Sequence, residues 1–290
     1  MILEEYLSPA SIQEALGILQ SYQGQAQIIA GGTDLIPELK KQTRRVRCLV
    51  DISGVEELKK IGLDGDDIKI GAGVTHTEIA SSKLIIDKFP ALAKAASEVG
   101  SPQIRNIGTI GGNICSARPA ADTIGPLIGY GAEVKIASDQ GENWLALEEL
   151  FTGPGETILK PGEILTEILI KPPIPETHSS YTKFGPRKAL AVAIVSVTSV
   201  ITLDPGSGKC KEARIVLGAV APTLIRCLES EEVLVNKKIT EDLAAQAGSL
   251  AAQSCQPISD IRGSAEYRRE MVKILVRRAL EQTMQGAEQR

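Results

Sequence analysis

Two pairs of adjacent glycines are the residues of this sequence best placed to do chemistry. Gly31-Gly32 follows the strand-like run 27–30, and Gly111-Gly112 lies further along the chain in a stretch rich in glycine and polar residues. Adjacent glycines expose consecutive backbone N–H groups where no Cβ blocks a ligand, and this suits a phosphate. A single Gly-Gly pair is more often only a tight turn. Together, the two pairs predict that the halves of a diphosphate are held without a lysine.

The standard glycine motifs of nucleotide-binding proteins do not fit. Segment 71–76 begins like G-x-G-x-x-G but lacks the third glycine. Gly208-Lys209 is followed by Cys210, and Leu203 stands where a P-loop needs its first glycine. A Rossmann site and a P-loop are therefore both disfavoured.

Side chains that could bind a metal or catalyse a reaction directly are scarce. The chain has 2 histidines and 5 cysteines, and the cysteines form no C-x-x-C pair. This pattern indicates neither a disulfide framework nor a zinc or iron–sulfur site. We therefore predict no catalytic side chain and no metal ligand, and a redox reaction would have to be carried by a bound cofactor.

Composition excludes several classes of partner. The 290 residues are 43% hydrophobic with a net charge of -4, which predicts a compact chain without the basic field that attracts nucleic acid. No segment has the length and apolar character of a membrane span, and the N-terminus lacks the features of a secretory signal. We expect a cytoplasmic protein with reduced cysteines.

The elements that would position the first glycine pair form a small βαβ-like unit. Ser11 and Glu14 have capping-box spacing and begin a helix, segment 27–30 is a strand that ends in the glycines, and segment 35–41 is helical. A hairpin is expected over 58–73. The glycine-rich stretch 100–122 is expected to be a long irregular loop, which usually has a functional reason.

A second domain is expected after the proline cluster 172–175, because proline donates no hydrogen bond to a central strand. Strand candidates follow at 180–184, 191–203 and 213–220, and the last helix is expected over about 264–285. The sequence thus predicts a small α+β domain at the C-terminal end.

The two glycine segments resemble those of a known family. Segments 28–35 and 101–114 look like the paired FAD-binding loops of molybdenum hydroxylase flavoprotein subunits, those of the xanthine dehydrogenase and carbon monoxide dehydrogenase type. Segment 116–131 is similar to the continuation of that site, and segment 260–269 resembles the signature of the family's C-terminal domain. The resemblance covers essentially the whole chain.

The resemblance implies a fold and its boundaries. The fold class is α+β, with a two-lobed FAD-binding domain of the vanillyl-alcohol oxidase (PCMH) type at residues 1–174, and lobes of about 1–55 and 56–174. A CO dehydrogenase flavoprotein C-terminal-like domain follows at 177–286, with an antiparallel sheet and helices.

It also implies which residues contact FAD. The expected contacts come from both glycine loops and from four positions outside them: Ile28, Ile29, Ala30, Gly31, Gly32, Thr33, Asp34, Leu35, Val99, Thr109, Ile110, Gly111, Gly112, Asn113, Asp122, Leu165 and Lys183.

Several of these positions have a simpler interpretation. Asp122 would receive hydroxyls of the ribityl or ribose part, but it could equally cap the helix after Pro119. Without the resemblance, Leu165 would be strand core and Lys183 a solvated charge. Val99 stands where some relatives place an aromatic ring against the flavin. No histidine lies in either loop, so the FAD is expected to be non-covalent, and His76 is interpreted as a polar residue at the end of the hairpin.

The resemblance implies an electron-transfer role. The FAD would receive electrons from 2Fe-2S clusters in a small partner subunit, after substrate oxidation at a molybdopterin centre in a large one, and pass them to NAD, oxygen or a quinone-linked carrier. We expect a xanthine dehydrogenase-like complex, a dimer of heterotrimers. The alternatives are a free-standing FAD-dependent oxidase or reductase on the same fold and a scaffold protein that has lost its redox role. The substrate and the acceptor stay open.

Overall fold

The computed structural model describes residues 3–41, 46–187 and 190–288, and its contacts divide the chain into two compact units. Unit 1 comprises Met1–Glu78, Pro102–Ala117 and Ala132–Lys171, and unit 2 comprises Ile79–Ser101, Arg118–Gly131 and Pro172–Arg290. Each unit is therefore assembled from several separate segments of the chain. Among the helices that the structure describes, none combines the length and the apolar character needed to cross a bilayer.

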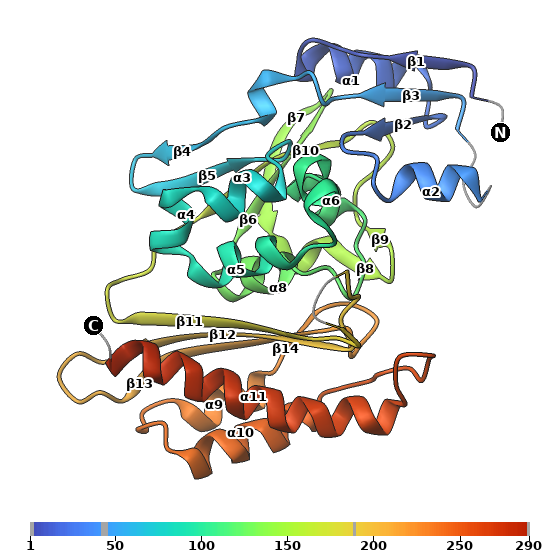
Figure 1. Ribbon diagram of the computed structural model, residues 1–290. Helices are drawn as coiled ribbons and strands as arrows, with labels where there is room; N and C mark the ends of the chain where they lie inside the picture. The colour runs from blue at the N-terminus through green and yellow to red at the C-terminus, as the bar shows by residue number, and fades with distance from the viewer. Residues whose placement is uncertain (1–2, 42–45, 188–189, 289–290) are drawn as a thin grey trace. The chain divides into compact units, whose positions relative to one another are not determined.

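Unit 1 begins with a three-stranded parallel sheet between two helices. The sheet has the order β1-β3-β2, and its elements with the flanking helices are β1 (Glu5–Leu7), α1 (Ile12–Ser21), β2 (Ala26–Ile29), α2 (Leu35–Lys40) and β3 (Cys48–Asp51) (Figure 1). Because successive strand residues point to opposite faces, Ile28 and Val50 pack in the core that contains α1, whereas Ile29 and Leu49 pack in the core that contains α2. The last residue of β2, Ile29, therefore packs on the side of the sheet that α2 covers.

The Ser11 cap at the start of α1 is confirmed, but the reciprocal bond of Glu14 goes to the residue before the cap. The Ser11 side chain accepts a hydrogen bond from the Glu14 backbone N–H, and Glu14 Oε2 in turn accepts one from the Ala10 backbone N–H at 2.8 Å.

The rest of unit 1 is built on an antiparallel sheet of order β4-β5-β10-β6-β7. The expected hairpin is present as β4 and β5, with Gly65 at positive φ in its turn. The elements are η1 (Glu56–Leu58), β4 (Ile61–Asp64), β5 (Asp67–Gly71), α6 (Pro102–Ile107), α7 (Ile110–Cys115), β6 (Glu133–Ser138), β7 (Gly141–Ala146), η2 (Leu147–Leu150), β8 (Phe151–Gly153), β9 (Glu156–Thr157) and β10 (Ile164–Ile170); α3 (His76–Ser81) crosses from unit 1 into unit 2. The expectation of an irregular loop over 100–122 was wrong, because α6 and α7 form there.

Unit 2 is an antiparallel sheet covered by helices on both faces. Its sheet has the order β11-β12-β13-β14. The elements are α4 (Lys83–Lys88), α5 (Pro90–Glu98), α8 (Ile124–Gly129), β11 (Thr177–Phe184), β12 (Val195–Leu203), β13 (Cys210–Gly218), β14 (Ile225–Arg226), α9 (Leu228–Leu234), α10 (Glu241–Gln253) and α11 (Ala265–Glu288). In Figure 1 the long helix α11 runs along β11 and β12.

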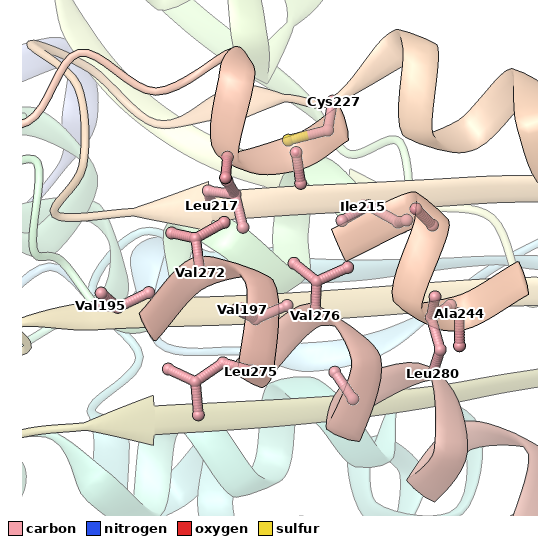
Figure 2. Close-up of a cluster of buried hydrophobic side chains, with 14 of the residues drawn as sticks. Val195, Val197, Ile215, Leu217, Cys227, Ala244, Val272, Leu275, Val276 and Leu280 are labelled. Atoms are coloured by element: carbon pink, nitrogen blue, oxygen red, sulfur yellow. The ribbon is translucent and has the colours of Figure 1, made fainter. Parts of the chain in front are cut away.

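The main core of unit 2 lies between this sheet and helices α9, α10 and α11. Val197 of β12 and Leu217 of β13 face Val272 and Val276 of α11 across it, as Figure 2 shows. On the opposite face of the sheet, Thr198 of β12 lies against Gly125 and Gly129 of α8. Alternate residues of β12 therefore pack on opposite faces of the sheet, one against α11 and the other against α8.

Candidate functional site

The first glycine bend joins β2 to α2 in unit 1. Gly32 adopts a positive φ of 66°, and its carbonyl accepts the Ile36 N–H at 3.0 Å, which starts the helix. In the described part of the chain, the backbone N–H groups of residues 31–34 donate no hydrogen bond to a protein atom. Four consecutive donors are thus free for a ligand, and unpaired N–H groups in such a row attract anions.

The second glycine pair lies in the first turn of α7, and this second bend is held by backbone pairing with segment 72–76. The Gly111 N–H donates to Ala72 O at 2.9 Å, and Thr109 forms an antiparallel bridge with Thr75. A Cβ on Gly111 would come within 2.6 Å of Ala72 Cβ, so only glycine fits there. Thr109 caps the helix, because its Oγ1 accepts the Gly112 N–H at 3.1 Å.

The two bends meet inside unit 1. A Cβ on Gly31 would lie 1.9 Å from the carbonyl oxygen of Ile107 and 3.0 Å from Cα of Gly108. The backbone of the first bend therefore touches the residues that lead into the second, and the absence of a side chain at Gly31 is what allows this contact. The structure therefore places the first glycine pair against residues 107–108, which come just before the helix turn that contains the second pair.

His76 adjoins the same place and was misjudged from the sequence. It is the first residue of α3 rather than a polar hairpin end, and its residue surface is 2% exposed. Its backbone N–H donates to Gly108 O at 3.0 Å. Burial, together with the nearby charge of Arg105, lowers the pKa of the imidazole to about 4, so the ring is neutral at pH 7.

Leu165 also belongs to unit 1. It lies in β10, is 4% exposed, and pairs with Ile136 of β6. This is the position of an ordinary strand-core residue, which the sequence already allowed.

The other candidate residues belong to unit 2, where Asp122 and Lys183 form a buried ion pair. Lys183 Nζ lies 2.7 Å from Asp122 Oδ2, and each side chain is 8% exposed. Lys183 also donates to the carbonyl oxygen of Glu98 at 3.1 Å. The two simpler interpretations of these residues are wrong. Lys183 is buried and not a solvated charge, and the N-cap of α8 is Thr123, not Asp122.

Tyr181 completes this cluster and was not found from the sequence. Its hydroxyl donates to Asp122 Oδ1 at 2.6 Å. Tyr181 and Lys183 are two residues apart on β11, so they project from the same face of the sheet. Burial raises the pKa of Asp122, whereas the Lys183 ammonium and the Tyr181 hydroxyl act in the opposite direction by stabilising its ionised form.

Val99 ends α5 in unit 2 and is half-buried. No aromatic ring occupies this position.

Comparisons with known proteins show the family. Residues 3–173 match the model of the FAD binding domain in molybdopterin dehydrogenase, and residues 180–283 match that of the CO dehydrogenase flavoprotein C-terminal domain. The chain belongs to the FAD-binding subunit family of the molybdenum hydroxylases. It therefore carries an FAD-binding domain and is similar to subunits of oxidoreductase complexes.

Relatives of this flavoprotein family match over nearly their full length. The xanthine dehydrogenase FAD-binding subunit of Escherichia coli O157:H7 is 31% identical over 285 residues, covering 97% of this chain and 96% of that protein. Subunit alpha of the 6-hydroxypseudooxynicotine dehydrogenase complex of Paenarthrobacter nicotinovorans is 34% identical, covering 98% and 95%.

Solved structures of the family agree with the fold. Carbon monoxide dehydrogenase from Hydrogenophaga pseudoflava, in a form lacking the Mo-pyranopterin moiety, superposes with a TM-score of 0.93 at 30% identity and covers 97% of each chain. Quinoline 2-oxidoreductase from Pseudomonas putida 86 gives a TM-score of 0.91 at 33% identity, covering 98% of each. The expected two-domain FAD-binding α+β fold is confirmed.

The residues described here fit such a cofactor. The diphosphate of FAD needs closely spaced donors and room for its oxygens to approach the backbone. The first bend offers four N–H groups that are unpaired within the described residues, and Gly31 leaves room for the close approach to residues 107–108.

Proposed function

We propose that the FAD diphosphate is held by the two glycine bends of unit 1. The observation that carries this proposal is the contact of Gly31 with Ile107 and Gly108, beside the free N–H groups of residues 31–34. The full set of proposed contacts is that given by the family resemblance: residues 28–35, 109–113 and Leu165 from unit 1, and Val99, Asp122 and Lys183 from unit 2. The domain boundaries of 1–174 and 177–286 are part of the same proposal.

The protein's contribution to the chemistry is binding and orientation. The N–H groups of residues 31–34 would donate to the diphosphate without a lysine, because those of Gly111 and Gly112 already donate to Ala72 and to Thr109. Asp122 would accept bonds from sugar or ribityl hydroxyls. Lys183 and Tyr181 hold that carboxylate in one orientation by occupying one oxygen each. FAD, when bound without a covalent link, supplies the redox chemistry and connects one-electron donors with a two-electron acceptor.

On this basis we infer an electron-transfer subunit. Electrons would arrive from 2Fe-2S clusters of a small subunit, after substrate oxidation at the molybdopterin of a large subunit, and leave to NAD, oxygen or a quinone-linked carrier. A xanthine dehydrogenase-like complex, a dimer of heterotrimers in the cytoplasm, is the assembly we propose. The relative from Escherichia coli supports the xanthine dehydrogenase type.

Affinity purification of the tagged chain from its native cells tests the proposal. We expect a large and a small subunit to co-purify with molybdenum and iron, and the flavin absorbance near its visible maximum to bleach anaerobically with the correct substrate. Xanthine, nicotinate, an aromatic aldehyde and carbon monoxide would be compared. A chain that purifies alone and reduces or oxidises a small substrate by itself would favour the free-standing oxidase or reductase. A chain that stays colourless with added FAD would favour a scaffold.

A further inference from the structure

The imidazole of His76 lies where the two glycine bends meet. If Gly108 carried a Cβ, His76 Cδ2 would lie 3.4 Å from it and Thr33 Oγ1 would lie 3.6 Å from it. The histidine ring and the hydroxyl of the first bend therefore flank the same glycine. All of these residues belong to unit 1.

The two edges of the ring have different surroundings. Nδ1 is enclosed and has no hydrogen-bond partner in the described part of the chain. In an imidazole, Cδ2 and Nε2 are bonded neighbours on the edge opposite Nδ1. Cδ2 is the His76 atom nearest to the position of a Gly108 Cβ, so the edge formed by Cδ2 and Nε2 lies closer to Gly108 than Nδ1 does.

The tautomer follows from these surroundings. A neutral imidazole has one N–H, and an enclosed N–H without an acceptor is rarer in proteins than an enclosed acceptor without a donor. The proton is therefore expected on Nε2. This places a side-chain N–H donor on a ring that lies against Gly108, which the Thr33 hydroxyl of the first bend also approaches.

We infer that His76 is a diphosphate-binding residue, which donates a hydrogen bond from Nε2 to the anionic group held by the two glycine bends. The inference rests on the proposed function and adds a side chain to a site otherwise made of backbone. A neutral donor suits this position, because it binds the anion without adding a buried charge.

Nitrogen NMR of the FAD-free full chain tests this directly. The chain has only two histidines, His76 and His178, so a His178→Gln variant assigns both imidazoles. Adding inorganic pyrophosphate, and FAD in a second titration, should shift the Nε2 resonance of His76. It should also raise the pKa of His76 from about 4, because a bound anion favours the protonated ring. The resonances of His178 should not move.

Substitutions separate donation from packing. His76→Gln places an amide N–H near the position of Nε2, whereas His76→Leu fills similar volume without a donor, and His76→Asn reaches only the position of Nδ1. The Kd for FAD, measured by quenching of flavin fluorescence, should rise about tenfold or more for Leu and Asn, as expected for a lost hydrogen bond to a charged group. It should stay within about threefold for Gln, and His178→Leu should match the wild type.

The outcomes distinguish the inference from the proposed function. If the wild type binds FAD while the His76 resonances stay fixed and His76→Leu binds equally well, His76 is only a packing residue. If neither pyrophosphate nor FAD binds the wild type, the proposed diphosphate site is wrong, and this inference fails with it. The NMR titration needs no variant at His76, so a substitution that prevents folding would not remove the test.

Discussion

Replacing Gly31 with alanine should separate the two bends. The added Cβ would start 1.9 Å from the carbonyl oxygen of Ile107, and real Cβ atoms essentially never come closer than 3.0 Å to another heavy atom. The atoms it meets first are backbone atoms of Ile107, which cannot rotate away as a flexible side chain would. One of the two bends must therefore move by about 1 Å.

The displacement sets the size of the effect. Overpacking of this kind costs about 1–3 kcal/mol of folding free energy. Moving the backbone donors by about 1 Å lengthens hydrogen bonds of about 2.9 Å beyond their useful range. Losing one such bond to a phosphate costs about 1.5–3 kcal/mol, which corresponds to a Kd for FAD raised roughly tenfold to a hundredfold.

The assay compares Gly31→Ala with Gly17→Ala. Gly17 lies within α1, and a Cβ there would meet no atom within 4 Å. Gly17→Ala should raise the free energy of unfolding in urea by about 0.5–1 kcal/mol, because alanine favours the helix, and should leave the Kd for FAD unchanged. The reasoning is refuted if Gly31→Ala binds FAD as tightly as Gly17→Ala and unfolds at the same urea concentration.

Three further outcomes follow from other contacts. Tyr181→Phe leaves one oxygen of the buried Asp122 without its donor, so the free energy of unfolding should fall by about 1.5–3 kcal/mol in urea. Leu217→Ala empties a fully buried position and should cost about 2–5 kcal/mol, whereas Leu63→Ala, at a position 66% exposed, should stay within about 0.5 kcal/mol; calorimetry compares them. His76 has a folded-state pKa of about 4, below its usual 6.5, so the unfolded chain takes up the proton first as the pH falls. Stability should therefore decrease by about 2 kcal/mol between pH 7 and pH 5 through this group, and His76→Leu should abolish that part of the decrease, as urea unfolding at both pH values would show.

Elements with a strong local signal could be predicted from the sequence. Helix α1 has a Ser11 cap and an apolar face, and the hairpin of β4 and β5 lies within the residues expected for it. The long helix α11 has a face formed by Val272, Leu275, Val276 and Leu280, at the spacing of a buried helix. In each case the period of apolar residues and the packing in the structure agree.

Elements that depend on contacts between distant residues could not be predicted from the sequence. Helices α6 and α7 have six residues each, too few for a periodic pattern, and helices this short depend on tertiary contacts. α7 in particular is positioned by the pairing of its first residues with segment 72–76. His76 was misread for the same reason, because its contact with Gly108 joins residues that are distant in sequence.

The cluster of Asp122, Tyr181 and Lys183 in unit 2 could be predicted only in part from the sequence. Tyr181 and Lys183 alternate on one strand, and this alone could have placed them on one face. Their partner Asp122 lies 59 residues from Tyr181, and only folding brings them together. A buried lysine is stable in its charged form only beside such a carboxylate. The pairing therefore explains why Lys183 is not the solvated charge that its residue type suggests.

The first glycine bend shows how a ligand site made of backbone groups differs from ordinary close packing. A glycine whose Cβ would strike another backbone is required by close approach, but this alone does not mark a ligand site: Gly248 of α10 would strike Lys273 of α11, in a helix contact that only packs a core. At Gly31 the same constraint occurs beside N–H groups that have no partner in the described chain. Core helices satisfy their own backbone donors, whereas a bend that leaves four of them free needs a ligand or water to do so. It is this combination of a forced glycine and unpaired donors that distinguishes the proposed FAD site from ordinary tight packing.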